Sequence, residues 1–142
     1  MIERTRWDDA AKTHSNALQS ISLVIPIHNE EQSLETLHQR ITTVVQSLTD
    51  HYEIIFINDG STDGSAAALE RLWRDDKHVK VLQLRRNFGK AAALAVGFEE
   101  AQGDIVITMD GDLQDDPDEI PRLVACLRDG YDVVSGWKQE RH

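Results

Sequence analysis

The chain has 142 residues, and its 25 acidic and 15 basic side chains give a formal net charge of -10 at pH 7. This length is enough for one domain with a proper core, and no apolar run approaches the roughly 18 residues of a membrane-spanning helix. The acidic balance argues against a nucleic-acid partner, which requires a basic stripe, but it is compatible with phosphate that is bound through a metal ion.

Residues 1–20 form a polar extension without the apolar core of a secretory signal. The rest of the chain alternates between strand-like and helix-like patterns, which predicts a mostly parallel sheet joined by right-handed crossovers. The predicted strands are residues 21–25, 52–57, 79–84, 105–109 and 131–135. Four helices are predicted. The first starts at about residue 31, the second runs through residues 66–73, the third runs from residue 89 to about 103, and the fourth covers residues 120–127.

Several single residues also have a predicted place in this fold. Pro26 is expected to end the first strand, and the strand at 105–109 is expected to be buried. The aromatic residues Trp73, Phe98 and Trp137 are expected to pack in the core.

Polar and charged clusters follow the first four predicted strands. They are residues 26–30, 58–61, 85–90 and 110–114. Because the carboxyl ends of parallel strands lie along one rim of a sheet, we expect these segments to form one pocket.

Asp110 and Asp112 are the most informative pair in the chain. Two carboxylates at the end of a strand repel each other unless a cation lies between or beside them. Mg²⁺ and Mn²⁺ prefer oxygen ligands and often bridge carboxylates to the phosphates of a substrate. The pair therefore indicates a divalent metal that holds a phosphorylated substrate. The acidic residues of the segment 115–119 are instead expected to cap the next helix.

Motifs of several other enzyme classes are missing from the sequence. No Gly-x-Gly-x-x-Gly or Gly-x-x-x-x-Gly-Lys occurs, so neither a nicotinamide enzyme nor a P-loop nucleotidase is expected. No serine lies on a Gly-x-Ser-x-Gly elbow, which argues against a Ser-His-Asp hydrolase. A single cysteine and the lack of a His-x-x-x-His pair argue against zinc.

Three motifs occur in a fixed order: Pro-Ile-His-Asn-Glu at 26–30, Asn-Asp-Gly-Ser-Thr-Asp at 58–63 and Asp-Gly-Asp at 110–112. With them the chain resembles family-2 glycosyltransferases of the GT-A fold. Segments 84–90 and 109–117 look like the bacterial branch similar to dolichol-phosphate mannosyltransferase, which glycosylates polyprenyl phosphate. The resemblance covers about residues 21–141. It implies an α/β fold, namely the Rossmann-like GT-A fold that binds nucleotide sugars, with helices on both faces of a mostly parallel sheet. It also implies that this domain is incomplete at its C-terminus.

The resemblance also implies which residues form the site. Asp112, with Gln114 and Asp110, would hold Mg²⁺ or Mn²⁺, and the two aspartates would be the catalytic carboxylates. Asn58 stands where the family usually has a carboxylate, and Lys138 stands where relatives often have arginine. The implied contacts to the nucleotide-sugar donor are Pro26, His28, Glu30, Asn58, Asp59, Lys90, Asp110, Gly111, Asp112, Gln114 and Lys138.

The function implied by the resemblance is inverting transfer of a sugar from a nucleoside-diphosphate sugar to polyprenyl (undecaprenyl or dolichyl) phosphate. Residues 21–142 would be the donor-binding domain, soluble by itself, of a protein that acts at the cytoplasmic face of a membrane. No general base is identified, and the formation of a homo-oligomer stays open. Two alternatives also stay open: a nucleotide-sugar-binding module that is inactive alone, and a receiver-type signalling domain with an acidic Mg²⁺ site.

Overall fold

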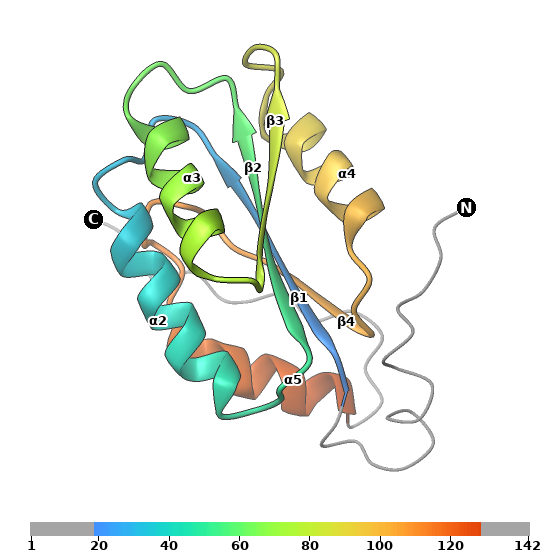
Figure 1. Ribbon diagram of the computed structural model, residues 1–142. Coiled ribbons are helices and arrows are strands. Elements are labelled where there is room, and N and C mark those ends of the chain that lie inside the picture. The colour runs from blue at the N-terminus through green and yellow to red at the C-terminus, as the bar shows by residue number, and fades with distance from the viewer. Residues whose placement is uncertain (1–18, 129–142) are drawn as a thin grey trace.

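The computed structural model describes residues 19–128 (Figure 1). Lys138, Trp137 and the predicted strand at 131–135 lie outside this range. Four parallel strands form one sheet in the order β3-β2-β1-β4. The strands are β1 (Ile21–Ile27), β2 (Tyr52–Asp59), β3 (Val79–Leu84) and β4 (Ile105–Thr108). The predicted α/β class and the mostly parallel sheet are therefore confirmed.

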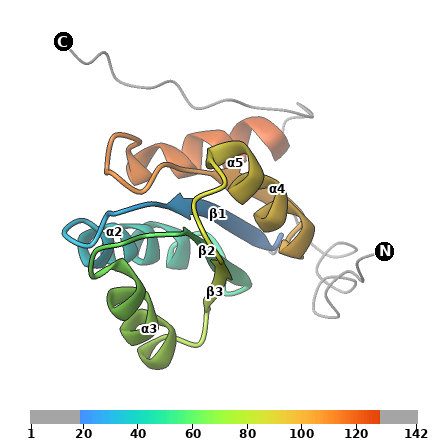
Figure 2. The same cartoon turned by 90° about the horizontal axis from the view of Figure 1, so that it is seen from above.

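Helices cover both faces of this sheet. Side chains of α2 (Leu34–Gln46), α3 (Ser65–Asp75) and α5 (Ile120–Arg128) pack on one face, and those of α4 (Lys90–Glu100) pack on the other. Figure 2 shows α4 on the opposite side of the sheet from α2 and α3. A short 3-10 helix, η2 (Pro117–Glu119), leads into α5. Among residues 19–128, no helix combines the length and the apolar character that crossing a membrane requires.

The contact between α4 and the sheet is close because the helix carries small residues on this side. Ala93 is fully buried, and a Cβ added to Gly97 would lie 2.4 Å from Cγ1 of Val24. Phe98 in α4 is 50% exposed, and Trp73 in α3 is 57% exposed. The prediction that these two aromatic side chains pack in the core is wrong, because smaller neighbouring residues form the packing faces of both helices.

The first strand does not end at Pro26, as the sequence pattern predicted, but continues through Ile27. β4 pairs with β1 only as far as Val24, whereas β2 pairs along the whole of β1. Among the described strands, Pro26 therefore has a neighbour on the β2 side and none on the β4 side. The missing N–H on the β4 side breaks no ladder hydrogen bond between these strands. The end of β1 consequently reaches the rim of the sheet as regular strand.

Two further predictions need correction. α2 begins at Leu34 rather than near Glu31, because residues 31–33 form a turn before the helix. β4 is not buried throughout: Val106 is 38% exposed, and Thr108 is exposed as well. The reason is that α4 packs over β1 and β2, so none of the helices within residues 19–128 covers this face of β4.

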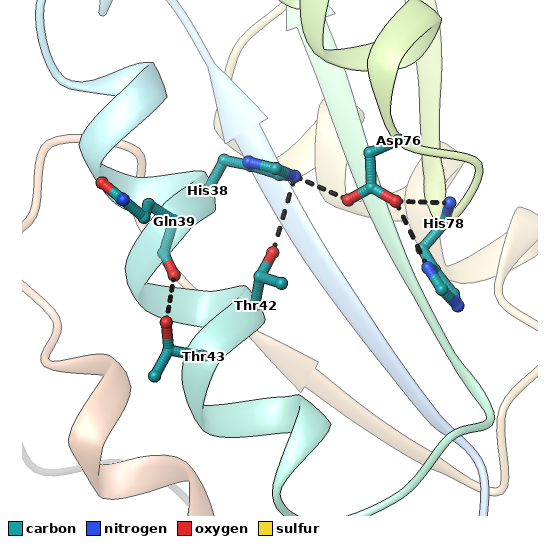
Figure 3. Close-up of polar contacts among 6 residues, drawn as sticks. All are labelled: His38, Gln39, Thr42, Thr43, Asp76 and His78. Carbon is teal, nitrogen blue, oxygen red and sulfur yellow. Dashed lines mark hydrogen bonds and ion pairs between the residues drawn. The ribbon is translucent and has the colours of Figure 1, made fainter.

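A polar cluster joins α2 to the turn before β3 (Figure 3). The carboxylate of Asp76 accepts hydrogen bonds from Nε2 of His38 (2.7 Å) and from the backbone N–H (2.9 Å) and Nδ1 (3.2 Å) of His78. The ring of His78 stacks on Tyr52, with 4.0 Å between the ring centroids. Burial raises the pKa of the Asp76 carboxyl, but these hydrogen bonds outweigh it, and the pKa lies below its ordinary value. The cluster therefore stabilises the fold in its ionised form.

Candidate functional site

The loops that follow the four strands lie next to one another along one rim of the sheet. In the loop after β1, the side chain of Asn29 accepts hydrogen bonds from the backbone N–H groups of Thr62 (2.8 Å) and Asp63 (3.2 Å) in the loop after β2. A Cβ on Gly60 would lie 2.3 Å from the backbone nitrogen of Asn87, so the loops after β2 and β3 are in contact. The loop after β4 lies against the end of β1, and all four predicted clusters thus meet on this rim.

The Asp110-Gly111-Asp112 turn is anchored from three sides. The hydroxyl of Ser33 donates a hydrogen bond to the carbonyl oxygen of Gly111 (2.7 Å). A Cβ added to Gly111 would lie 2.5 Å from Cδ1 of Ile27, so any larger residue here would have to displace that side chain. The backbone N–H of Asp110 donates to the carboxylate of Asp115 (2.9 Å). These contacts fix the base of the turn against β1 and α2.

The outer part of this turn presents oxygen atoms toward solvent. Asp112 and Gln114 are both exposed, and the backbone N–H of Gln114 donates to Oδ1 of Asp112 (3.0 Å). Leu113 between them has a φ of 66°, which is an uncommon conformation for a non-glycine residue. This tight bend keeps a carboxylate and a side-chain amide on adjacent parts of one loop.

The pKa of Glu30 reflects the negative charge that is concentrated on the rim. Burial is the largest effect that raises the pKa of its carboxyl, and the charges of Asp112, Asp63 and Asp110 raise it further. A hydrogen bond with Ser33 lowers the pKa but does not offset these effects. A cation bound at this rim would relieve the repulsion among the carboxylates.

Lys90 brings a positive charge to the same place. Its ammonium group forms an ion pair with Oδ1 of Asp110. The Lys90 side chain is 56% exposed, whereas that of Asp110 is 17% exposed. Two residues that the sequence assigned to the site from distant segments are therefore in direct contact.

Asn58 and Asp59 are buried at the end of β2, with 1% and 3% exposure. The carboxylate of Asp59 accepts hydrogen bonds from the backbone N–H groups of Phe88 (2.8 Å) and Gly89 (3.0 Å). The Asn58 amide group donates to Oε1 of Gln83 (2.9 Å), and its side-chain oxygen also accepts from a backbone N–H in the turn that follows β2. Both side chains hold the loops of the rim together in this structure.

His28 lies at the exposed start of the loop after β1. Its Nδ1 is 2.9 Å from the carbonyl oxygen of Asp59, and because a carbonyl only accepts, Nδ1 carries the proton. The side-chain amide nitrogen of Asn87 lies 3.0 Å from Nδ1 and 3.1 Å from Nε2 of the same ring. Pro26, two residues earlier, is half-buried in β1. The imidazole thus links the loops after β1, β2 and β3.

Three side chains that hold the rim were missed by the sequence analysis. Asn29 has a φ of 57°, a conformation that asparagine adopts more readily than most residues. Its position in a polar turn was the one feature of the sequence that could have indicated this role. Ser33 precedes α2 but makes no side-chain cap to that helix, and bonds to Gly111 instead. Asp115 was expected to cap a helix, but its carboxylate holds the backbone of Asp110.

The donor atoms on this rim fit a hard divalent cation, although the described residues do not form a full ligand set by themselves. No three His, Cys, Asp or Glu side chains within residues 19–128 are placed to hold a metal ion. Of the predicted ligands, Asp110 is paired with Lys90, while Asp112 and Gln114 are exposed. Mg²⁺ in particular is usually bound by one or two carboxylates, with water and substrate phosphates completing its shell. The arrangement therefore suits an ion that arrives together with a phosphorylated ligand.

The chain matches known proteins over most of its length. A family model described as glycosyl transferase family 2 matches residues 22–141. The chain is also 46% identical, over 125 residues, to an undecaprenyl-phosphate 4-deoxy-4-formamido-L-arabinose transferase of Proteus mirabilis (strain HI4320). This match covers 87% of the chain and 38% of the relative.

Two solved structures are similar to the fold described here. One is a mannosyltransferase from Pyrobaculum calidifontis in complex with GDP-Man and Mn²⁺, with 26% identity, a TM-score of 0.70, and coverage of 80% of this chain and 33% of that chain. The other is glucosyl-3-phosphoglycerate synthase from Mycobacterium tuberculosis in complex with Mn²⁺, UDP and phosphoglyceric acid. It has 27% identity and a TM-score of 0.61, and the match covers 89% of this chain and 44% of that chain. The chain spans less than half the length of each of these relatives.

Proposed function

The chain belongs to glycosyl transferase family 2, and from this membership we propose that it binds the nucleoside-diphosphate sugar in an inverting glycosyltransferase. Residues 21–142 would form the donor-binding domain. The proposed acceptor is polyprenyl phosphate, a class that includes the undecaprenyl phosphate in the name of the Proteus mirabilis relative. Because the chain spans 38% of that relative, the activity, the acceptor and action at the cytoplasmic face of a membrane all belong to the proposal.

The observation that carries the proposal is the exposed Asp112 on an anchored turn, beside Glu30 and Asp110. A diphosphate would bring more negative charge to this acidic rim, so its binding requires a cation. Asp112 would hold Mg²⁺ or Mn²⁺, with Gln114 on the same turn and Asp110 next to it. When bound, this ion stabilises the negative charge that develops on the departing nucleoside diphosphate.

The remaining rim residues would receive the nucleoside. Glu30 is half-buried and has the acceptor oxygens that a ribose hydroxyl or a base N–H requires. His28 is exposed at the start of the same loop, and the half-buried Pro26 would form part of the wall beside the nucleoside. Asn58 and Asp59 would act by holding the loops in place, because their side chains are buried and hydrogen-bonded to those loops.

An acceptor phosphate explains why a strong general base is not required. Its attacking oxygen is already anionic near neutral pH, so no proton has to be removed before attack. The oxygen forms a bond to the anomeric carbon of the sugar while the bond from that carbon to the diphosphate breaks. Attack from the side opposite the leaving group inverts the anomeric configuration.

Sugar transfer to a lipid tests this proposal. The chain is incubated with Mn²⁺, radiolabelled UDP- and GDP-sugars, and vesicles that contain undecaprenyl phosphate. The expected product is a lipid-linked sugar whose formation is lost in Asp112→Ala and retained in Asp118→Ala, which removes an exposed carboxylate of η2.

One alternative function is a module that binds the donor without transferring it, and the coverage of 38% of the relative favours keeping it. Metal-dependent binding of the donor without any lipid product would support this alternative. Membership of the family rules out the receiver-type signalling domain.

A further inference from the structure

We propose that Lys90 is a built-in counter-ion of the rim, which occupies the cation position beside Asp110 until a divalent metal arrives with the donor. The proposal rests on the proposed function and adds to it a coupling between the two ligands. Its starting point is the ion pair between the Lys90 ammonium and Asp110, one of the predicted metal-site carboxylates.

The charges around this pair explain why a cation is needed before any ligand binds. Asp110 is only 17% exposed, and Glu30 nearby already has its pKa raised by burial and then by negative charges that include Asp112 and Asp110. A partly buried carboxylate in such a field is stabilised by a nearby positive charge. Lys90 provides this charge from the first residue of α4, the element that precedes β4 and the acidic turn.

The structure holds the backbone of Lys90 while its tip can move. The carboxylate of Asp59 accepts hydrogen bonds from the backbone N–H groups of Phe88 and Gly89, directly before Lys90. The Lys90 side chain is 56% exposed and carries a point charge on a flexible stem. The ammonium group can therefore leave Asp110 without any rearrangement of α4.

A divalent ion that approaches Asp110 must displace the ammonium group or bind beside it. Without a nucleotide, no phosphate is present to receive the released ammonium, so Lys90 opposes metal binding. With a nucleoside diphosphate present, the phosphate oxygens offer a partner to the metal and to Lys90 together. Metal and nucleotide should therefore each strengthen the binding of the other, by the same factor in both directions.

Binding of Mn²⁺ alone, followed by electron paramagnetic resonance of the free ion, tests the first half of this inference. Lys90→Met should bind Mn²⁺ about two- to fivefold more tightly than the unmodified chain, the range expected for an ion pair with one exposed partner. Lys90→Arg keeps the charge and should stay close to the unmodified chain. Lys77→Met removes one exposed lysine from the turn before β3 and controls for the change in net charge.

Binding of UDP and GDP at saturating Mn²⁺ tests the second half. Lys90→Met should bind the preferred nucleotide several-fold more weakly than the unmodified chain. Its affinity for Mn²⁺ alone should therefore rise while its affinity for the nucleotide falls. Equal Mn²⁺ affinity in Lys90→Met and Lys77→Met would overturn the counter-ion role. Weaker binding of both Mn²⁺ and the nucleotide by Lys90→Met would also overturn it, because this result indicates local damage to the site. Failure of the unmodified chain to bind any nucleotide with Mn²⁺ would overturn the proposed function itself. The titration with Mn²⁺ alone tests the role of Lys90 separately, because it requires no nucleotide.

Discussion

The hydroxyl of Ser33 donates a 2.7 Å hydrogen bond to the carbonyl oxygen of Gly111, across 78 residues of sequence. This bond ties the start of α2 to the turn that presents Asp112. It is one of the contacts that make the acidic turn part of the folded core rather than a loose loop.

Replacement of Ser33 by alanine is expected to weaken this turn. The Gly111 carbonyl loses its partner in a partly buried place, which costs about 1–2 kcal/mol of unfolding free energy in urea denaturation. Metal-dependent nucleotide binding should also fall several-fold, as calorimetry would measure. Ser47→Ala removes a hydroxyl that bonds locally to Val44 at the end of α2, and it should leave nucleotide binding unchanged. Equal nucleotide affinities in the two variants would contradict the anchoring role of Ser33.

Gly111→Ala tests the close approach between the acidic turn and β1. The new Cβ would lie 2.5 Å from Cδ1 of Ile27, and such overpacking costs about 1–3 kcal/mol of unfolding free energy. Ile27→Val removes this Cδ1 atom, so the same change should cost clearly less in an Ile27→Val background. A double-mutant cycle of urea unfolding measures the difference, and strict additivity would show that the contact is not the cause.

Asp59→Asn tests whether this buried carboxylate holds the loop that precedes α4. One oxygen is replaced by an NH₂ group, which then faces a backbone N–H of Phe88 or Gly89, donor against donor. The expected loss is about 2–3 kcal/mol of unfolding free energy, because a charge-assisted hydrogen bond is lost and a buried donor is left unpaired. Asp118→Asn changes an exposed carboxylate and should shift the stability by less than about 0.5 kcal/mol. Similar losses in the two variants would contradict the loop-holding role.

The Asp76 cluster predicts a specific loss of stability in acid. The pKa of Asp76 in the folded chain lies below its ordinary value of 3.8, so the ionised carboxylate stabilises the fold. This contribution is complete above about pH 4 to 5 and is lost as the pH falls through the lower, folded-state pKa. Asp76→Asn should therefore lower the unfolding free energy by about 1–3 kcal/mol at pH 7, where its hydrogen bonds with His38 and His78 are weakened.

The pH dependence of that difference is the decisive part of the measurement. The gap in unfolding free energy between Asp76→Asn and the unmodified chain should shrink as the pH falls from 5 toward 3. Asp75→Asn, an exposed neighbour at the end of α3, should show little effect at any pH. A gap of constant size over this range would mean that the ionised carboxylate does not stabilise the cluster.

The sequence predicted the family, the GT-A fold and the parallel sheet because these depend on local patterns. Apolar runs of strand length and polar motifs directly after them are visible along the chain, and topology then places their ends on one rim. The boundary at Pro26 was wrong because it depends on where the neighbouring β4 stops, which no local pattern reveals. Trp73 and Phe98 were misplaced for a related reason, since packing faces are chosen by the whole set of neighbours.

Within the site, the sequence identified the charged residues but not which of them hold the structure. Asp59 has the same motif position whether its carboxylate meets a ligand or the backbone of Phe88 and Gly89. The bonds from Ser33 to Gly111 and from Lys90 to Asp110 join residues distant in sequence, and they appear only when the loops are assembled. The assignments to Lys138 lie outside the described residues and stay predictions.

The central claim is that the acidic rim binds a nucleoside diphosphate through a divalent cation held at Asp112. Isothermal titration calorimetry with UDP and with GDP, each in the presence of Mn²⁺ and in the presence of a chelator, tests it most directly. We predict binding of at least one nucleotide that requires Mn²⁺, that falls by about tenfold or more in Asp112→Ala, and that is unchanged in Asp118→Ala. Binding of equal strength with the chelator, or in Asp112→Ala, would contradict the claim.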